Sequence, residues 1–331
     1  LVTGWGATGS FAGGLTGYNS GVIKFDRNAA VSTRSVAGIV VGKDYVGGVI
    51  GFNDEKGTIN VDYKLIGGRV RATGDCAGGL VGLNASTELL EQTLTIQPSS
   101  VQGRYYVGGA IGANVVNLNS DITVDGLTVN NSLGTITAEA YCGGLIGYQR
   151  TYTAANLGGK HFQEALSDGT LLTGIREGNV PGTAAASLNN NTITITAAGN
   201  ADLKTASNNM TIRAYAYAGG IVGYCESQTK MYVKDCLNAG GFERPTLTSS
   251  LSSGVDMETY LSAQGYAEAA KALHTELAGS TMCVSIIGGV VGVNGENHVI
   301  DHCGNTGTMN GLNAMGGVVG LNEGIIRGCT L

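Results

Sequence analysis

A seven-residue glycine phrase occurs eight times and constrains the fold of this chain more than any other feature. It reads as two glycines, two mostly apolar residues, a third glycine, an apolar or aromatic residue and, usually, asparagine. The phrases begin at Gly13, Gly47, Gly78, Gly108, Gly143, Gly219, Gly288 and Gly316. Most intervals are about 30 residues, whereas those ending at Gly219 and Gly288 are more than twice as long. Each unit of such a repeat buries its apolar face only against its neighbours, so the repeat predicts a solenoid.

The local chemistry of the phrase favours strands over helices. A glycine inside a helix costs about 1 kcal/mol relative to alanine, and each phrase holds three. The apolar positions are mostly Val, Ile and Leu, and a second strand-like run follows most phrases, such as GTITA from Gly134. We therefore predict an all-β parallel β-helix of about eight to ten coils, forming a single β-solenoid over residues 1–331.

The glycines and asparagines of the phrase have separate predicted roles. The glycine pairs are expected to take positive φ at corners and to let adjacent coils approach closely. Asparagine tolerates left-handed turns, and side chains stacked at the ~4.8 Å strand spacing can bond along the axis. This predicts an internal structural ladder of Asn19, Asn53, Asn84, Asn114, Asn294 and Asn322. A ligand-binding row is the alternative.

The apolar positions of the phrase form two rows. Strict alternation puts Ile50 and Phe52 on one face, directed inward, and Val49 on the opposite face. Strands that are apolar on both faces are normally covered on both. Either a glycine bend returns the second row to the core, or an insertion or a partner protein covers it.

Two segments interrupt the repeat. Residues 150–210 are interpreted as an insertion or a degenerate coil and include a strand-like run from Asn191. Residues 240–282 form a second insertion with a predicted helix over 256–277, because Met257, Leu261 and Leu273 lie on one apolar stripe. We expect this helix to pack on the solenoid, with a ligand lid as the alternative.

The seven cysteines follow the repeat rather than a disulfide or metal pattern. Cys236, Cys303 and Cys329 each lie three residues after an apolar strand residue, which predicts a core cysteine stack. Cys76 and Cys142 both precede a glycine pair and are expected to share a second position. No CxxC spacing is present, so neither a metal site nor a cofactor is predicted.

Composition excludes two classes of partner. The formal net charge of −6 and the absence of a basic stripe argue against nucleic acid. No apolar stretch reaches the ~18 residues needed to span a bilayer, so no membrane insertion is expected within this segment.

The signatures of catalysis are also weak. His298 and His302 fall four residues apart on a predicted strand, about 13 Å, too far to share a zinc ion. No HExxH, GxSxG or P-loop occurs. The nearest charged cluster is interpreted as solvated surface because neighbouring coils add no matching carboxylates; it consists of Asp62, Lys64, Arg69, Arg71 and Asp75. We therefore predict that the chain is not an enzyme.

Two stretches support a resemblance to a known family. GGVVGVNGENHVIDHCGNTGTM from Gly288 and GGVVGLNEGIIRGCTL from Gly316 are similar to the GLUG repeat of bacterial surface proteins. GGLIGYQ and GGIVGYC lack the terminal asparagine of that repeat. The resemblance implies a secreted or surface-attached bacterial protein, sometimes an adhesin and sometimes a stalk beside a peptidase domain. It supplies no catalytic residue to transfer.

The leading hypothesis is a non-catalytic repeat segment of a large secreted or cell-surface bacterial protein, acting as an adhesin or a structural spacer. Its partner would be a host surface protein, a glycan or other copies of itself. Alternatives are a polysaccharide-active β-helix enzyme and a self-assembling filament or layer component. Neither end carries the polar cap of a closed solenoid, so we expect a fragment of a longer chain whose signal and anchor lie outside it.

Overall fold

The computed structural model describes residues 1–4, 10–24, 35–36, 38–60, 65–90, 94–117, 121–152, 191–197, 200–214, 216–225, 229–243, 286–310 and 314–331. Within these ranges the chain is all-β, without a helix, and its strands form long parallel sheets. The prediction of an all-β chain with parallel strands is confirmed at this level.

The described strands form four larger sheets, here named I to IV. Sheet I contains β1 (Val2–Gly4), β6 (Ile39–Gly42), β10 (Leu65–Ala72), β13 (Leu94–Gln102), β18 (Thr135–Ala138) and β22 (Thr211–Ala214), with β5 (Ser35–Val36) and β17 (Leu127–Val129) beside this path. Sheet II contains β2 (Phe11–Gly13), β7 (Tyr45–Gly47), β11 (Cys76–Gly78), β14 (Tyr106–Gly108), β19 (Tyr141–Gly143), β23 (Tyr217–Gly219), β27 (Ile286–Gly288) and β31 (Ala314–Gly316).

Sheets III and IV follow sheets I and II along each repeat. Sheet III contains β3 (Thr16–Asn19), β8 (Ile50–Asn53), β12 (Val81–Asn84), β15 (Ile111–Asn117), β20 (Ile146–Tyr152), β24 (Val222–Cys225), β28 (Val291–Asn294) and β32 (Val319–Asn322). Sheet IV contains β16 (Ile122–Val124), β21 (Thr192–Thr196), β25 (Lys230–Lys234), β29 (His298–Asp301) and β33 (Ile325–Arg327). Two short pairs complete the described strands: β4 (Val22–Lys24) with β9 (Thr58–Asn60), and β26 (Leu237–Asn238) with β30 (Gly304–Asn305).

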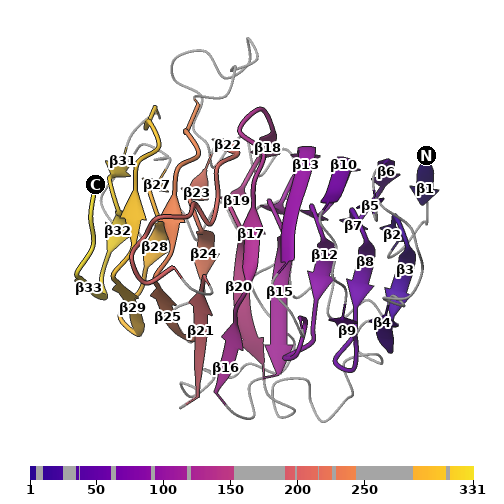
Figure 1. Ribbon diagram of the computed structural model, residues 1–331, viewed down its shortest axis with the longest axis horizontal. Helices are drawn as coiled ribbons and strands as arrows, with labels where there is room; N and C mark the ends of the chain where they lie inside the picture. The colour runs from indigo at the N-terminus through magenta and orange to yellow at the C-terminus, as the bar shows by residue number, and fades with distance from the viewer. Residues whose placement is uncertain are drawn as a thin grey trace, which may run out of the picture.

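Each phrase pairs with the same positions of the phrases before and after it. Cys76 pairs with Tyr45 on one side and with Tyr106 on the other, and Asn84 pairs with Asn53 and Asn114 in the same way. The two termini consequently lie at opposite ends of the longest axis, with the strands ordered between them (Figure 1). This order is consistent with a parallel β-helix.

The glycine pair is required by close backbone approach. A Cβ on Gly47 would stand 1.8 Å from the carbonyl oxygen of Ile50 in the same repeat. A Cβ on Gly48 would stand 2.1 Å from the carbonyl oxygen of Gly79 in the next repeat. The expectation that these pairs take positive φ is wrong, because the positive-φ glycines of the described residues are Gly68, Gly126 and Gly328. The asparagines of the phrase lie in strands rather than in left-handed turns.

The apolar residues of the phrase divide between two hydrophobic clusters. Val49 and Ile50 both lie in the main core, whereas Phe52 lies in a second cluster with Tyr45. The strict alternation predicted for Ile50 and Phe52 is therefore wrong. Gly51 separates them, and it lies against the backbone of the preceding repeat, with a Cβ site 2.7 Å from the amide nitrogen of Ala12. The chain bends at Gly48 and Val49, between β7 and β8, and Val49 lies in the core.

The second cluster is an aromatic stack built from sheets II and III. The rings of Tyr106 and Tyr141 stack at a centroid distance of 5.3 Å, and those of Tyr141 and Tyr217 stack at 5.1 Å. Tyr148, from sheet III, packs against Tyr106 at 4.3 Å. Such pairs contribute about 0.5–1.5 kcal/mol beyond area burial. The aromatic stack therefore joins successive repeats along the axis.

The two predicted insertions are described only in part. Within 150–210, β21 pairs in parallel with β16 and β25 and so occupies a place in sheet IV. Residues 153–190 and 244–285, including the helix predicted at 256–277, lie outside the described residues.

Candidate functional site

The six asparagines of the predicted ladder lie at the ends of sheet III strands, and most are buried. The Nδ2 of each donates to the Oδ1 of the next: Asn19 to Asn53 at 2.8 Å, Asn53 to Asn84 at 2.9 Å and Asn84 to Asn114 at 2.7 Å. Asn294 donates to Asn322 at 2.7 Å. The row therefore has a direction, with donors facing the C-terminal end. Its side chains bond mainly to each other and to backbone, which favours the structural role over a ligand-binding row.

The two phrases that lack the terminal asparagine interrupt this row. Asn114 Nδ2 donates to Gln149 Oε1 at 2.7 Å, so glutamine continues the row by one step. Cys225 occupies the next register position and supplies no amide. Beyond it, the buried Asn294 Oδ1 has no hydrogen-bond partner. The row is thus two ladders separated at Cys225.

A second amide row, missed by sequence reasoning, runs through Asn208, Asn238 and Asn305. Asn208 Nδ2 donates to Asn238 Oδ1 at 2.8 Å, and Asn238 Nδ2 donates to Asn305 Oδ1 at 2.8 Å. The three side chains pack against the second glycine of the phrases at Gly144, Gly220 and Gly289. The available signal was the C-x-N spacing shared by Cys236–Asn238 and Cys303–Asn305.

The predicted cysteine row lies just after the strands of sheet IV. Cys236 and Cys303 are buried, and Cys329 is partly buried. Each thiol donates to a carbonyl of the preceding repeat, as Cys303 does to Val233 at 3.5 Å and Cys329 to Ile300 at 3.8 Å. The neighbouring Cys236 thiol and burial together raise the pKa of Cys303. Protonated, hydrogen-bonded thiols of this kind are poor nucleophiles and poor metal ligands.

The prediction that Cys76 and Cys142 share one position in the repeat is wrong. Cys76 lies in the aromatic stack and pairs with Tyr106, whereas Cys142 lies in the main core and pairs with Val107. Burial raises the pKa of Cys142 as well. In the described part of the chain, no group of three His, Cys, Asp or Glu side chains is placed to hold a metal ion.

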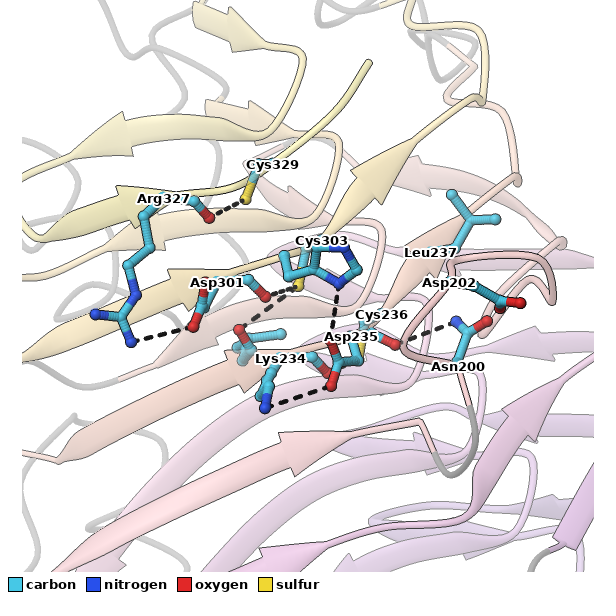
Figure 2. A network of polar contacts seen from close by, with 12 residues as sticks. Asn200, Asp202, Lys234, Asp235, Cys236, Leu237, Asp301, Cys303, Arg327 and Cys329 are labelled. Atoms are coloured by element: carbon cyan, nitrogen blue, oxygen red, sulfur yellow. Dashed lines mark hydrogen bonds and ion pairs between the residues drawn. The ribbon is translucent and has the colours of Figure 1, made fainter.

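The outward face of sheet IV carries a polar network, and Figure 2 shows the ion pair of Arg327 and Asp301 within it. Arg327 Nη2 lies 3.0 Å from Asp301 Oδ2 and donates to the Tyr232 hydroxyl at 3.2 Å. The Tyr232 hydroxyl in turn donates to Asp301 Oδ2. This hydrogen bond, and secondarily Arg327, hold the pKa of Asp301 below its usual value. The carboxylate is therefore held in its charged form by its neighbours.

The turn after sheet IV holds a second pair within the same network. His302 Nδ1 lies 2.8 Å from Asp235 Oδ1, and Lys234 Nζ lies 3.7 Å from Asp235 Oδ2. Asp235 and His302 have positive φ values of 53° and 48°. The equivalent position in the next repeat is Gly328, whose φ is 61°. Left-handed backbone costs residues other than glycine about 1–2 kcal/mol, so hydrogen bonding helps to offset strain here. The structure places His298 in β29 and His302 just beyond it, so the two histidines do not share one strand as predicted. The buried His298 Nδ1 accepts a hydrogen bond from the Gly295 N–H at 2.9 Å.

The outward face of sheet I carries two parallel rows of polar side chains, here named the outer polar rows. They alternate with buried residues such as Val70, Val101 and Ile136. In register across β10, β13, β18 and β22, the first row is Arg69, Ser100, Thr135 and Thr211, and the second is Arg71, Gln102, Thr137 and Arg213. Arg213 Nε donates to Glu243 Oε2 at 2.8 Å.

The sequence cluster that contains Arg69 and Arg71 divides in the structure. Both arginines are exposed, as expected for a solvated surface. Asp75 is buried at 3% exposure, so its interpretation as solvated surface is wrong. Asp62 and Lys64 lie outside the described residues.

The comparisons with known proteins give one partial likeness. The chain is 32% identical over 174 residues to halomucin of Haloquadratum walsbyi, a match that covers 49% of this chain and 2% of halomucin. No protein-family model matches the chain, and no solved structure matches it. Among the described residues there is no helix of the length and apolarity that crossing a membrane requires.

Proposed function

We propose that this chain is a β-solenoid of the parallel β-helix type and a non-catalytic repeat segment of a large secreted or cell-surface protein. In this role it acts as an adhesive element or as a spacer that holds other domains away from the surface. Its resemblance to the GLUG repeat supports a bacterial surface protein of this kind.

The observation that carries the proposal is the constant register of the phrases in sheets II and III. Strands of sheets II and III pair only with the repeats immediately before and after them, from β2 to β31 and from β3 to β32. Inside the stack, the asparagine ladder and the aromatic stack repeat the same contacts along the axis. Stability is then a sum of neighbour interactions, so such a stack can be lengthened without altering its cross-section. This property suits a spacer.

Two further observations support a location outside the cell. Part of the chain is similar to part of a protein named as a mucin, a class of secreted and surface proteins, and that protein is far longer than this chain. The free thiols of the described residues are mostly buried, including Cys142, Cys236 and Cys303. Burial protects thiols from oxidation in the compartments where exposed cysteines form disulfides.

The chemistry of the sheet IV network supports a non-catalytic role over the polysaccharide-active alternative. A general acid needs a pKa near the working pH, usually a raised one for a carboxyl group. Asp301 has the opposite shift, caused first by Tyr232 and then by Arg327. Its Oδ2 atom is engaged by these two side chains, which suits a structural carboxylate.

Two experiments test this proposal. Protease treatment of intact cells of the source organism should release peptides of this segment, identified by mass spectrometry, while cytoplasmic proteins remain intact. Incubation of the purified chain with a panel of polysaccharides should produce no new reducing ends. Turnover that is lost in Asp301→Asn would replace the proposal with the enzyme alternative, and peptides protected until lysis would remove the surface location.

A further inference from the structure

The two polar faces of this molecule differ in how their side chains are satisfied. On sheet IV, Tyr232, Asp301 and Arg327 bind each other, and Asp235 binds His302. On sheet I, Arg69 and Arg71 are exposed and form no ion pair or side-chain hydrogen bond among the residues that the structure describes. The same holds for the side chains of the other outer-row members apart from Arg213: Ser100, Gln102, Thr135, Thr137 and Thr211. The polar side chains of sheet IV thus bind each other, whereas those of sheet I leave hydrogen-bond donors available to a ligand.

Two described carboxylates, Glu139 just after β18 and Glu243 beyond β22, are each engaged by an arginine other than Arg69 or Arg71. Glu139 Oε2 lies 3.3 Å from Arg104 Nε, and Glu243 binds Arg213. Within the described part of the chain, no carboxylate is paired with Arg69 or Arg71, so their donors are available to a ligand there, although the whole chain carries a formal charge of −6. A local cationic patch on an acidic molecule selects for anionic groups.

We propose that the outer polar rows of sheet I bind a linear acidic polysaccharide, lying along the long axis of the molecule and bearing carboxylate or sulfate groups. This inference deepens the adhesive role proposed above and rests on it. It names the glycan class and the face that holds it.

The spacing of the rows fits a linear polymer of sugars. Successive members of a row lie one strand apart, about 4.8 Å, and the two rows lie about 6.6 Å apart along the strands. A glycan chain running across the strands therefore meets a new pair of side chains at each strand, a step comparable to the length of one extended sugar unit. Ser100, Thr135 and Thr137 can exchange hydrogen bonds with hydroxyl groups.

The two arginines supply the selectivity for acidic sugars. Arg69 and Arg71 project from the same face of β10, one from each row, so they flank a chain that lies between the rows. A guanidinium group binds carboxylate or sulfate through two parallel hydrogen bonds, a geometry that a lysine does not offer. Three strands further along, Arg213 occupies the same row as Arg71 but is shared with Glu243.

A nucleic acid is the competing anionic polymer, and the observations favour it less. Its binding depends on neutralising many phosphates, and two unpaired arginines on a chain of negative net charge provide little of this. The hydroxyl and amide groups between the arginines instead match a ligand rich in hydroxyl groups.

The test is affinity electrophoresis and biolayer interferometry of the full chain at low salt. The probes are sodium polygalacturonate, dextran sulfate, neutral dextran and duplex DNA. We expect binding to one or both acidic polysaccharides and none to neutral dextran. The double variant R69Q/R71Q should weaken binding about tenfold or more. Glu243→Gln, which releases Arg213, should strengthen it.

A matched control, K204Q/R327Q, removes two exposed positive charges from other parts of the surface and should leave binding unchanged. Circular dichroism establishes that each variant is folded. The proposal is overturned by equal losses in the two double variants, by unchanged binding in R69Q/R71Q, or by DNA binding more tightly than either acidic polysaccharide. Absence of binding to both acidic polysaccharides also overturns it, whereas the surface-exposure and turnover experiments decide the proposed function separately.

Discussion

The asparagine ladder of sheet III leads to a quantitative prediction for Asn84→Ala. Asn84 is 1% exposed. Its Nδ2 donates to Asn114 Oδ1 at 2.7 Å and to the Ser86 carbonyl at 2.8 Å, and its Oδ1 accepts from Asn53 Nδ2 at 2.9 Å and from the Ser86 N–H at 3.3 Å. Each hydrogen bond is worth about 1 kcal/mol net, and a stranded buried partner costs about 1–3 kcal/mol. We expect N84A to lower the free energy of unfolding by about 3 kcal/mol.

Asn322→Ala provides the matched control, because it removes the same side chain from the equivalent position of the second ladder, where it is exposed. Asn322 accepts from Asn294 Nδ2 at 2.7 Å and donates to the Gly324 carbonyl at 3.3 Å. Water can reach this site and replace the lost partner, so the expected cost is below about 1 kcal/mol. The difference between the two variants therefore isolates the cost of leaving amides unpaired inside the stack.

Urea unfolding followed by circular dichroism and tyrosine fluorescence measures both variants. Repeat stacks do not always unfold in one step, so coincidence of the two probes and equal m-values should be established first. A loss below about 1 kcal/mol for N84A, or equal losses in the two variants, would refute the reasoning, since the ladder would then contribute nothing specific to burial.

Three further predictions concern other parts of the stack. The double variant Q149N/C225N joins the two ladders and supplies a donor for the orphaned Asn294 Oδ1, so it should raise the urea midpoint; a lower midpoint would contradict a continuous ladder. Iodoacetamide labelling of the native protein should modify Cys329 before Cys236 and Cys303, because Cys329 is only partly buried whereas the other two thiols are buried; the opposite order of adducts in mass spectrometry would contradict this prediction. Asp301 has a folded-state pKa below its unfolded value of about 3.9, so its stabilisation is complete above pH 3.9 and is lost as the pH falls through the folded pKa. Unfolding midpoints at pH 5 and pH 2.5 should therefore differ less in Asp301→Asn than in the wild type, and equal differences would exclude this carboxylate as a source of acid sensitivity.

Sequence reasoning identified the repeat and its strands because the phrase is short, frequent and rich in glycine. It failed where backbone geometry decides the outcome. Gly47 and Gly48 are required by carbonyl oxygens about 2 Å from their missing Cβ atoms, not by positive φ. Gly51 breaks the two-residue period, so Ile50 and Phe52 enter different clusters. Periodicity alone contains no information on which glycine bends a strand.

The polar features were predictable only where they belong to the phrase. The asparagines of sheet III share one phrase position, whereas Asn208 and Asn238 lie outside any phrase, within the long intervals of the repeat. The sheet IV network joins residues 69 and 95 positions apart, Tyr232 with Asp301 and with Arg327. Such contacts depend on the register of whole repeats, which must be known before the pairing of side chains can be inferred.

Inward and outward polar side chains of this protein differ in whether they hydrogen-bond within the protein. Inward amides such as Asn84 and Asn238 bond along the axis, so their substitution changes stability. Outward groups such as Arg69 and Arg71 form no side-chain hydrogen bond or ion pair in the described part of the chain, so R69Q/R71Q should alter the free energy of unfolding by no more than about 0.5 kcal/mol. A stack built in this way lets its outer face vary without loss of the scaffold. If R69Q/R71Q instead lowered the urea midpoint as much as N84A does, the outer polar rows would be part of the scaffold, and a ligand would not be needed to explain them.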